Sequence, residues 1–355
     1  MRIFKLLLLF SSINLSAAEL PDCWLTATTS VKVTLPGRGA VESRRYLLQA
    51  EESAADTALA LFRPDAVIPS FRLAVWPELH TAIYARPIAY DSRLTGAHSE
   101  LLLLDASGKV WWLTLTSRGF GTPQLIADLH LPDWVFLQAF ELISAHLPAN
   151  LLAEPTSAAQ QQLLLLSARH LTSSQDKLIL LRIPEPGSTV VRFSDLADRT
   201  VLSDAELDDG LSHEQWQRLQ RHAGWWLQVD GQIRTPPLLV AGVIYSAVAP
   251  TTKAARQCAD EDKPQQLYAL HLYSGGRVYR ERRLMMPAYR GKLALQTGAE
   301  GQLALWWQGA EAEQLLLPAL LSLSPLCIDC VMPLLLPELH RWQRLTSYRL
   351  ESGAH

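Results

Sequence analysis

The chain has 355 residues, of which 48% are hydrophobic and 19% are charged, so it can bury a large core. Its formal net charge is −3, and this balance excludes broad electrostatic binding to nucleic acid or to an anionic membrane surface. The length suits two average domains, but an all-β propeller also reaches it as one unit.

The first eighteen residues predict a cleavable signal peptide. A basic start at residues 1–5 is followed by an apolar run at residues 6–10, and small residues close the segment at 16–18. The apolar run is shorter than the about 20 residues that a membrane-spanning helix needs. We therefore expect cleavage before Glu19, export, and a single domain over residues 19–355 with no membrane-spanning segment. An uncleaved anchor is the alternative.

Four cysteines follow the leader: Cys23, Cys258, Cys327 and Cys330. An even number in an oxidising compartment predicts structural disulfides, whose pairing the sequence leaves open. The C-x-x-C spacing at residues 327–330 is also typical of redox and zinc sites. A second C-x-x-C and a βαβ pattern are both missing from the sequence, so disulfides are favoured over redox or metal chemistry.

The body of the chain reads as a series of antiparallel hairpins, in which two apolar runs enclose a turn rich in glycine or polar residues. Glycine suits such turns because it adopts positive φ without steric cost. The expected hairpins occupy residues 100–115, 162–182, 237–247, 265–279 and 292–307. Their recurrence predicts an all-β protein with a β-propeller fold, and another β-sandwich or barrel is the alternative.

Two segments depart from the strand pattern. Within residues 203–221, Ser212 and Gln215 have the spacing of a capping box, which predicts a short helix inserted on a loop. Residues 251–264 are polar and charged around Cys258, so we expect a long external loop there. Loops on a rigid scaffold commonly carry binding, and both segments are candidate partner surfaces.

Several short motifs stand in a fixed order along the chain. The motif Gly224-Trp-Trp-Leu leads through Pro236 and Pro237 to an aromatic strand that ends near Pro250, and a cysteine-containing loop and Leu267-Tyr-Ala-Leu-His-Leu-Tyr-Ser-Gly275 then follow. Further motifs lie at residues 85–91, 101–115, 193–200 and 344–351. In content and order these motifs resemble the C-terminal β-propeller of type IV pilus tip proteins of the PilY and neisserial PilC family.

This resemblance implies a non-enzymatic protein of the type IV pilus system, located in the periplasm, at the pilus tip or on the cell surface. Its partners would be minor pilins or other pilus components, and its role would be pilus assembly, retraction control or adhesion. Family members usually carry a large region before the propeller. Here propeller-like sequence follows the leader almost at once, so we expect a short, divergent member with an abridged propeller.

The resemblance also implies a calcium loop of the form D-x-D-x-[DN]-G-x-x-D, whose oxygen atoms surround the ion. The residues at its ligand positions here are Asp91, Arg93, Thr95 and Ser99. Asp91 is the single carboxylate among them, and Arg93 places a positive charge where an acid belongs. We therefore predict that this loop does not bind calcium and that the protein carries neither a metal nor a cofactor.

Catalytic motifs are missing from the sequence: it contains no H-E-x-x-H, G-x-S-x-G, Walker or G-x-G-x-x-G pattern. We therefore expect a binding protein and not an enzyme. Two alternatives stay open, because one fold hosts many functions. One is a periplasmic scaffold propeller of the outer-membrane-assembly type. The other is a pyrroloquinoline-quinone dehydrogenase, because residues 267–275 also resemble the sequence repeat of those enzymes.

Overall fold

The computed structural model describes most of the chain between Trp24 and Ser322. The described residues are 24, 31–36, 43–52, 57–63, 71–73, 82–91, 97–116, 119–146, 160–185, 187–203, 206, 211–251, 258, 265–279, 281–287, 289–297, 302–310 and 312–322. The predicted signal peptide and the segment 344–351 lie outside them. No helix among the described residues is long and apolar enough to cross a membrane.

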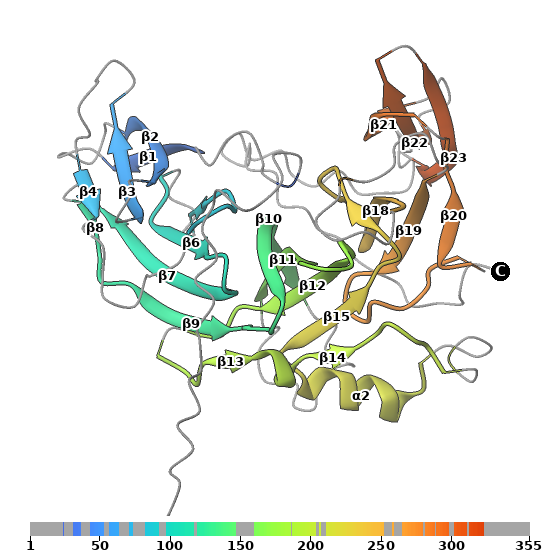
Figure 1. The fold of residues 1–355 in the computed structure, drawn as a ribbon, viewed down its shortest axis with the longest axis horizontal. Coiled ribbons are helices and arrows are strands. Elements are labelled where there is room, and N and C mark those ends of the chain that lie inside the picture. The colour runs from blue at the N-terminus through green and yellow to red at the C-terminus, as the bar shows by residue number, and fades with distance from the viewer. Residues whose placement is uncertain are drawn as a thin grey trace, which may run out of the picture.

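Five mainly antiparallel sheets follow one another around an arc, from β1–β4 at the upper left of Figure 1 to β21–β23 at the upper right, and β13 and β14 are parallel to their neighbours. The first sheet, in the order β1-β2-β3-β4, contains β1 (Val31–Pro36), β2 (Ser43–Glu52), β3 (Thr57–Phe62) and β4 (Phe71–Leu73). The second, in the order β13-β9-β7-β6-β5 with β8 on β7, contains β5 (Ile88–Tyr90), β6 (Glu100–Leu104), β7 (Lys109–Thr116), β8 (Gly119–Phe120), β9 (Gln124–Asp128) and β13 (Val191–Arg192).

The third sheet, in the order β10-β11-β12-β15-β14, contains β10 (Trp134–His146), β11 (Gln160–His170), β12 (Asp176–Arg182), β14 (Ala197–Asp198) and β15 (Gly224–Gln228). The fourth, in the order β16-β18-β19-β20 with β17 on β18, contains β16 (Gln232–Ile233), β17 (Leu238–Val240), β18 (Val243–Ala249), β19 (Gln266–His271) and β20 (Arg283–Met285). The fifth contains β21 (Gly291–Thr297), β22 (Gln302–Gly309) and β23 (Glu313–Ser322), in that order.

The inner strands bury both of their faces, and this explains the leucine runs of the sequence. On β6, Leu101 and Leu103 pack in the core shared with the first sheet, whereas Leu102 and Leu104 pack in the core shared with the third. On β11, Leu164 and Leu166 face the second sheet, and Leu163 and Leu165 face the fourth. Because successive side chains of a strand point to opposite faces, a strand between two apolar layers must be apolar at every position.

Four apolar cores therefore join the five sheets in sequence. The last of them packs Tyr245 and Ala247 of β18 against Leu305 and Trp307 of β22. Small, mainly antiparallel sheets stacked face to face around an arc are the architecture of a β-propeller, and the sheets here have three to six strands. The expectation of an all-β propeller is confirmed, and the described residues supply five of its sheets.

Most of the expected hairpins form with the expected turns. Strands β6 and β7 pair antiparallel, as do β11 with β12 and β21 with β22. Strands β17 and β18 meet at a two-residue turn in which Ala241 has φ 48° and Gly242 has φ 82°. Positive φ at both central residues is the type I′ geometry that matches the twist of a hairpin.

The hairpin expected at residues 265–279 is wrong in its second strand. Arg277 makes a single isolated bridge to Leu270, and the strand that pairs with β19 there is β20. The physical reason lies in Arg282, whose guanidinium donates hydrogen bonds to the carbonyls of Gly275, Arg199 and Thr200. These bonds tie the chain after the turn to a neighbouring loop, and the ladder resumes at Arg283.

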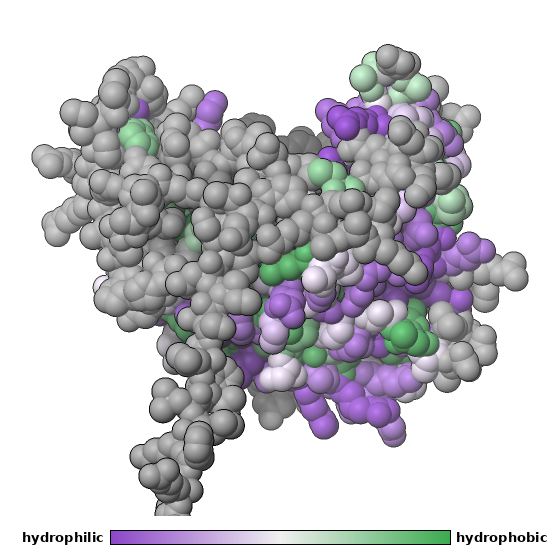
Figure 2. All heavy atoms as spheres, in the orientation of Figure 1, coloured by the Kyte–Doolittle hydropathy of each residue, from purple (hydrophilic) through white to green (hydrophobic). Residues whose placement is uncertain are grey.

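The short helix α2 (His213–Arg221) forms where the capping box predicts it. The Ser212 hydroxyl accepts the Gln215 amide, and the Gln215 side chain accepts the Ser212 amide at 2.7 Å. Leu219 is buried, Trp216 packs on the core of the third and fourth sheets, and the outer face is polar. Figure 2 shows mostly hydrophilic side chains in the region where Figure 1 places α2.

Candidate binding pocket between the fourth and fifth sheets

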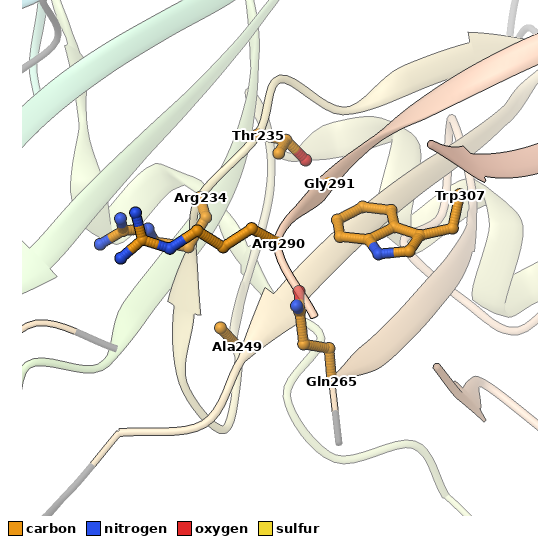
Figure 3. Close-up of a pocket in the computed structure, with 7 residues that line it drawn as sticks. All are labelled: Arg234, Thr235, Ala249, Gln265, Arg290, Gly291 and Trp307. Atoms are coloured by element: carbon orange, nitrogen blue, oxygen red, sulfur yellow. The ribbon is translucent and has the colours of Figure 1, made fainter. Parts of the chain in front are cut away.

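A small pocket opens between the fourth and fifth sheets (Figure 3). Its volume is about 200 Å³. The lining residues come from several strand ends and are Arg234, Thr235, Ala249, Gln265, Arg290, Gly291 and Trp307. We call this site the arginine pocket.

The floor of the arginine pocket is buried and hydrogen-bonded. Ala249, Gln265 and Trp307 are all buried. The Gln265 side-chain amide and the Trp307 indole N–H both donate to the Tyr289 carbonyl, at 3.0 and 3.1 Å. A Cβ at Gly291 would lie 2.7 Å from the Trp307 indole, so the backbone there passes close to the ring. These contacts fix the chain at the position from which Arg290 extends.

Arg234 lies next to a backbone amide that is held by a buried ion pair of the third sheet. The Arg169 Nε donates to Asp176 Oδ1 at 2.6 Å and its second guanidinium nitrogen to Asp176 Oδ2 at 2.8 Å. The Ile233 amide, adjacent to Arg234, donates to Asp176 Oδ2 at 2.7 Å. The third sheet thus holds the backbone on which Arg234 stands.

Positive charge gathers at this pocket. Figure 3 shows the Arg234 and Arg290 guanidinium groups together on one side and Trp307 on the other. Burial, followed by the positive charges of Arg169 and Arg290, lowers the pKa of Arg234, while Asp176 acts in the opposite sense. The Thr235 hydroxyl oxygen is buried and makes no hydrogen bond with the residues that the structure describes. Such a set of donors suits an anion, since guanidinium groups bind carboxylate and phosphate through paired hydrogen bonds.

A second hollow, of about 300 Å³, lies beside α2. Its walls include the partly buried ion pair of Arg199 with Glu206, and also Gln215, Arg218 and His222 of the helical insertion. Arg199 also donates to the Ser274 carbonyl at 2.7 Å, which ties the insertion to the fourth sheet. Of the segment 203–221, proposed from sequence as a partner surface, the described residues are 203, 206 and 211–221, and α2 presents a largely polar outer face there.

The segment 91–99, predicted from sequence to be a degenerate calcium loop that does not bind the ion, connects β5 to β6. Tyr90 and Glu100 pair across these strands, so the flanking Asp91 and Ser99 lie at the base of the loop. The Ser99 amide donates to the Tyr90 carbonyl at 3.0 Å. Arg93 and Thr95 lie outside the described residues. No group of three or more histidine, cysteine or acidic side chains that could hold a metal occurs in the described part of the chain.

Of the four cysteines, Cys258 is described, and it is disulfide-bonded. Cys23, Cys327 and Cys330 lie outside the described residues, so the pairing stays a prediction. Sequence reasoning missed the arginine pocket altogether. The sequence around Arg234 and Arg290 contains no motif that marks a binding site, because single arginines beside strand ends are common surface residues.

No protein-family model matches the sequence, and no curated protein matches it either. Among solved structures, the fold is similar to the crystal structure of the Pseudomonas aeruginosa PilY1 C-terminal domain, with a TM-score of 0.51. The similarity covers 81% of this chain and 71% of that chain at 11% sequence identity. The resemblance expected from the sequence phrases is therefore confirmed at the level of the fold, and the chain has a PilY1-type C-terminal β-propeller fold.

Proposed function

We propose that this chain is a non-enzymatic binding protein of the type IV pilus system that contacts minor pilins and supports pilus assembly or adhesion. The observation that carries the proposal is the fold shared with the PilY1 C-terminal domain over 81% of the chain. A fold alone does not define function, so the sequence phrases of the pilus tip family, found in the family's order, are the second support.

Export to the periplasm or the cell surface belongs to the same proposal. The predicted signal peptide at residues 1–18 supports it. The disulfide at Cys258 supports it as well, because disulfides persist in oxidising compartments.

We propose binding rather than catalysis because of the character of the two hollows. The arginine pocket, at about 200 Å³, is smaller than the roughly 300–1,000 Å³ of pockets that hold drug-sized ligands and cofactors. Its described lining holds arginine, threonine, glutamine and tryptophan side chains, without a nucleophile and base in contact. The surface of α2 presents exposed polar side chains, which suit contact with a protein partner.

A gene deletion in the native organism tests the pilus role. The pilin content of sheared surface fractions is compared between the parent, the deletion strain and the complemented strain. We expect the deletion to reduce surface pilin and the intact gene to restore it. Unchanged surface pilin in the deletion strain would overturn the role in assembly.

Complementation with surface variants then tests the proposed partner surface. The exposed α2 residues Glu214, Arg218 and Arg221 are replaced by residues of opposite charge, a change that spares the buried Leu219. The exposed Glu313 of the fifth sheet supplies the matched control, Glu313→Lys. We expect the α2 variant to restore less surface pilin than the control and to co-purify with less minor pilin. Equal restoration by both variants would remove α2 from the partner surface.

A further inference from the structure

Trp24 fixes the place where the start of the mature chain meets the stacked sheets. Its side chain is buried and packs in a small apolar core that includes Val135 and Leu171. The indole ring lies over the Arg169 guanidinium, whose carbon is 5.1 Å from the ring centroid. Cys23 directly precedes Trp24, and consecutive Cα atoms are about 3.8 Å apart. The position of Trp24 therefore sets the position of Cys23 as well.

Arg169 connects the position of Trp24 to the fourth sheet. A guanidinium nitrogen of Arg169 donates to the Ile233 carbonyl at 3.4 Å. Ile233 lies on β16, which pairs with the last two residues of β18. The final residue of β18 is Ala249, and the loop that contains Cys258 starts after it. The base of this loop and Trp24 are therefore separated by one guanidinium group and one pair of strands.

The loop is long enough to bring Cys258 from this base to Cys23. Cys258 is exposed and disulfide-bonded. An extended chain covers about 3.5 Å per residue, so the stretch from Ala249 to Cys258 reaches about 30 Å. That reach is several times the spacing of about 5 Å between paired strands. Chain length therefore permits a bond between the two cysteines.

The other two cysteines, in the C-x-x-C at residues 327–330, follow the fifth sheet. Its last strand, β23, ends at Ser322, which lies opposite Gln302, the first residue of β22. Gly291 pairs with the last residue of β22 and lines the arginine pocket together with Ala249. The 8 residues of β22 span about 25 Å between these two ends. The chain thus leaves the fifth sheet at the end away from Ala249, and the C-x-x-C spacing allows its two cysteines to pair with each other.

We propose that Cys23 and Cys258 form a disulfide, which fastens the loop between β18 and β19 to the chain beside Trp24, and that Cys327 pairs with Cys330. Each bond forms when two thiols pass two electrons and two protons to the disulfide of an oxidising protein, which becomes a dithiol. The first bond joins a point before β1 to a point after β18, and a disulfide that closes so long a loop restricts the unfolded chain strongly. It also anchors one of the two candidate partner surfaces. The pairing does not depend on a role in pili.

Peptide mapping of the full chain tests the pairing directly, because trypsin separates the candidate cysteines. Free thiols are blocked with N-ethylmaleimide, the protein is digested without reductant, and linked peptides are identified by mass spectrometry. Cys23 falls in the peptide that ends at Lys32, Cys258 in the peptide 257–277, and the C-x-x-C in the peptide 293–341. We expect the first two peptides to be linked and the third to be two hydrogens lighter than its dithiol form. A link between 257–277 and 293–341, or a blocked thiol at Cys23, would overturn the proposal.

Substitution measures what the bond contributes. Cys23→Ser and Cys258→Ser should each lower Tm by about 5 °C or more. The variant that carries both changes should lose no more than either single variant, because all three lack the same bond. Cys327→Ser/Cys330→Ser is the matched control, and its peptide map should retain the link between Cys23 and Cys258. Additive losses from Cys23→Ser and Cys258→Ser, or loss of the link in the control, would contradict the pairing.

Discussion

The Arg169 guanidinium and the Asp176 carboxylate form a buried ion pair with two hydrogen bonds, of 2.6 and 2.8 Å. The pair does more than close the β11–β12 hairpin, because the Ile233 amide donates to the same carboxylate and Trp24 stacks over the Arg169 guanidinium at 5.1 Å. Trp24, the third sheet and the fourth sheet therefore meet at one charged contact. The same contact positions Arg234 in the arginine pocket.

Breaking this pair should be costly, because a single substitution leaves one buried charge without its partner. We expect Asp176→Asn to lower the free energy of unfolding by about 3–5 kcal/mol. The double variant Arg169→Met/Asp176→Asn should be more stable than Asp176→Asn alone, since it removes the stranded charge and retains an acceptor for the Ile233 amide. Urea unfolding of the single and double variants measures both quantities. A double variant whose loss equals the sum of the single losses would contradict the coupling.

Stability should fall as the pH drops from neutral toward 4. Burial lowers the pKa of His271 from 6.5 to about 4, because its ring packs against Trp216 of α2 and near Tyr273. The unfolded chain therefore takes up this proton first, and the stability is complete above about pH 6.5 and lost through the window down to about 4. The loss is at most about 3 kcal/mol, since each pKa unit corresponds to about 1.4 kcal/mol.

Substitution isolates this contribution from that of the acidic side chains, which also titrate in acid. His271→Phe should flatten the pH dependence of urea unfolding between pH 6.5 and 4. His130→Phe, at an exposed histidine, serves as the control and should leave the profile unchanged. Identical profiles for His271→Phe and the wild type would show that His271 does not control the loss.

Substitution of Gly275 should be destabilising because an added side chain would meet the core. A second glycine with positive φ but open surroundings separates this steric effect from backbone strain. Gly275 has φ 60°, and an added Cβ would lie 2.9 Å from the Trp225 indole, which is buried. Gly187 has φ 87° but no atom within 4 Å of an added Cβ. Gly187→Ala should cost about 1–2 kcal/mol from backbone strain. Gly275→Ala should cost about 1–3 kcal/mol more, because the core must also move.

Thermal unfolding of the two alanine variants, compared by the shift in Tm, measures this difference. The near-ultraviolet circular dichroism of the tryptophans gives an independent reading for Trp225. Equal losses in both variants would mean that the Trp225 ring makes room for the methyl group.

The loop between β5 and β6 should not bind calcium tightly. It offers Asp91 as its single carboxylate and Arg93 as a positive charge at a ligand position, which leaves too little negative charge for a divalent ion. Calorimetric titration with calcium chloride should show no stoichiometric binding, and Asp91→Ala should give the same result.

A gain-of-binding variant sharpens this test. Replacing Arg93, Thr95 and Ser99 together by aspartate would supply the missing carboxylates, and we expect this triple variant to bind calcium. Tight calcium binding by the wild-type chain, abolished by Asp91→Ala, would show that the loop is functional as it stands.

The sequence by itself determined the local elements. The leucine runs at residues 101–104 and 163–166, the turn glycines and the Ser212–Gln215 capping box set strands, turns and helix α2, because each depends on neighbours a few residues away. The order of the family phrases also indicated the propeller. The strand expected at Arg277 was wrong because the distant carbonyls of Arg199 and Thr200 hold Arg282.

Only the tertiary structure decided which charges meet. Arg169, Arg234 and Arg290 stand at the ends of strands in three different sheets, and no local pattern marks them as neighbours. Their approach depends on how the apolar faces of successive sheets stack, since that packing sets the distance between strand ends. The buried Asp176 holds the backbone amide beside Arg234, and Gln265 and Trp307 hold the carbonyl beside Arg290. The arginine pocket is thus a property of the stacked sheets and not of any one segment.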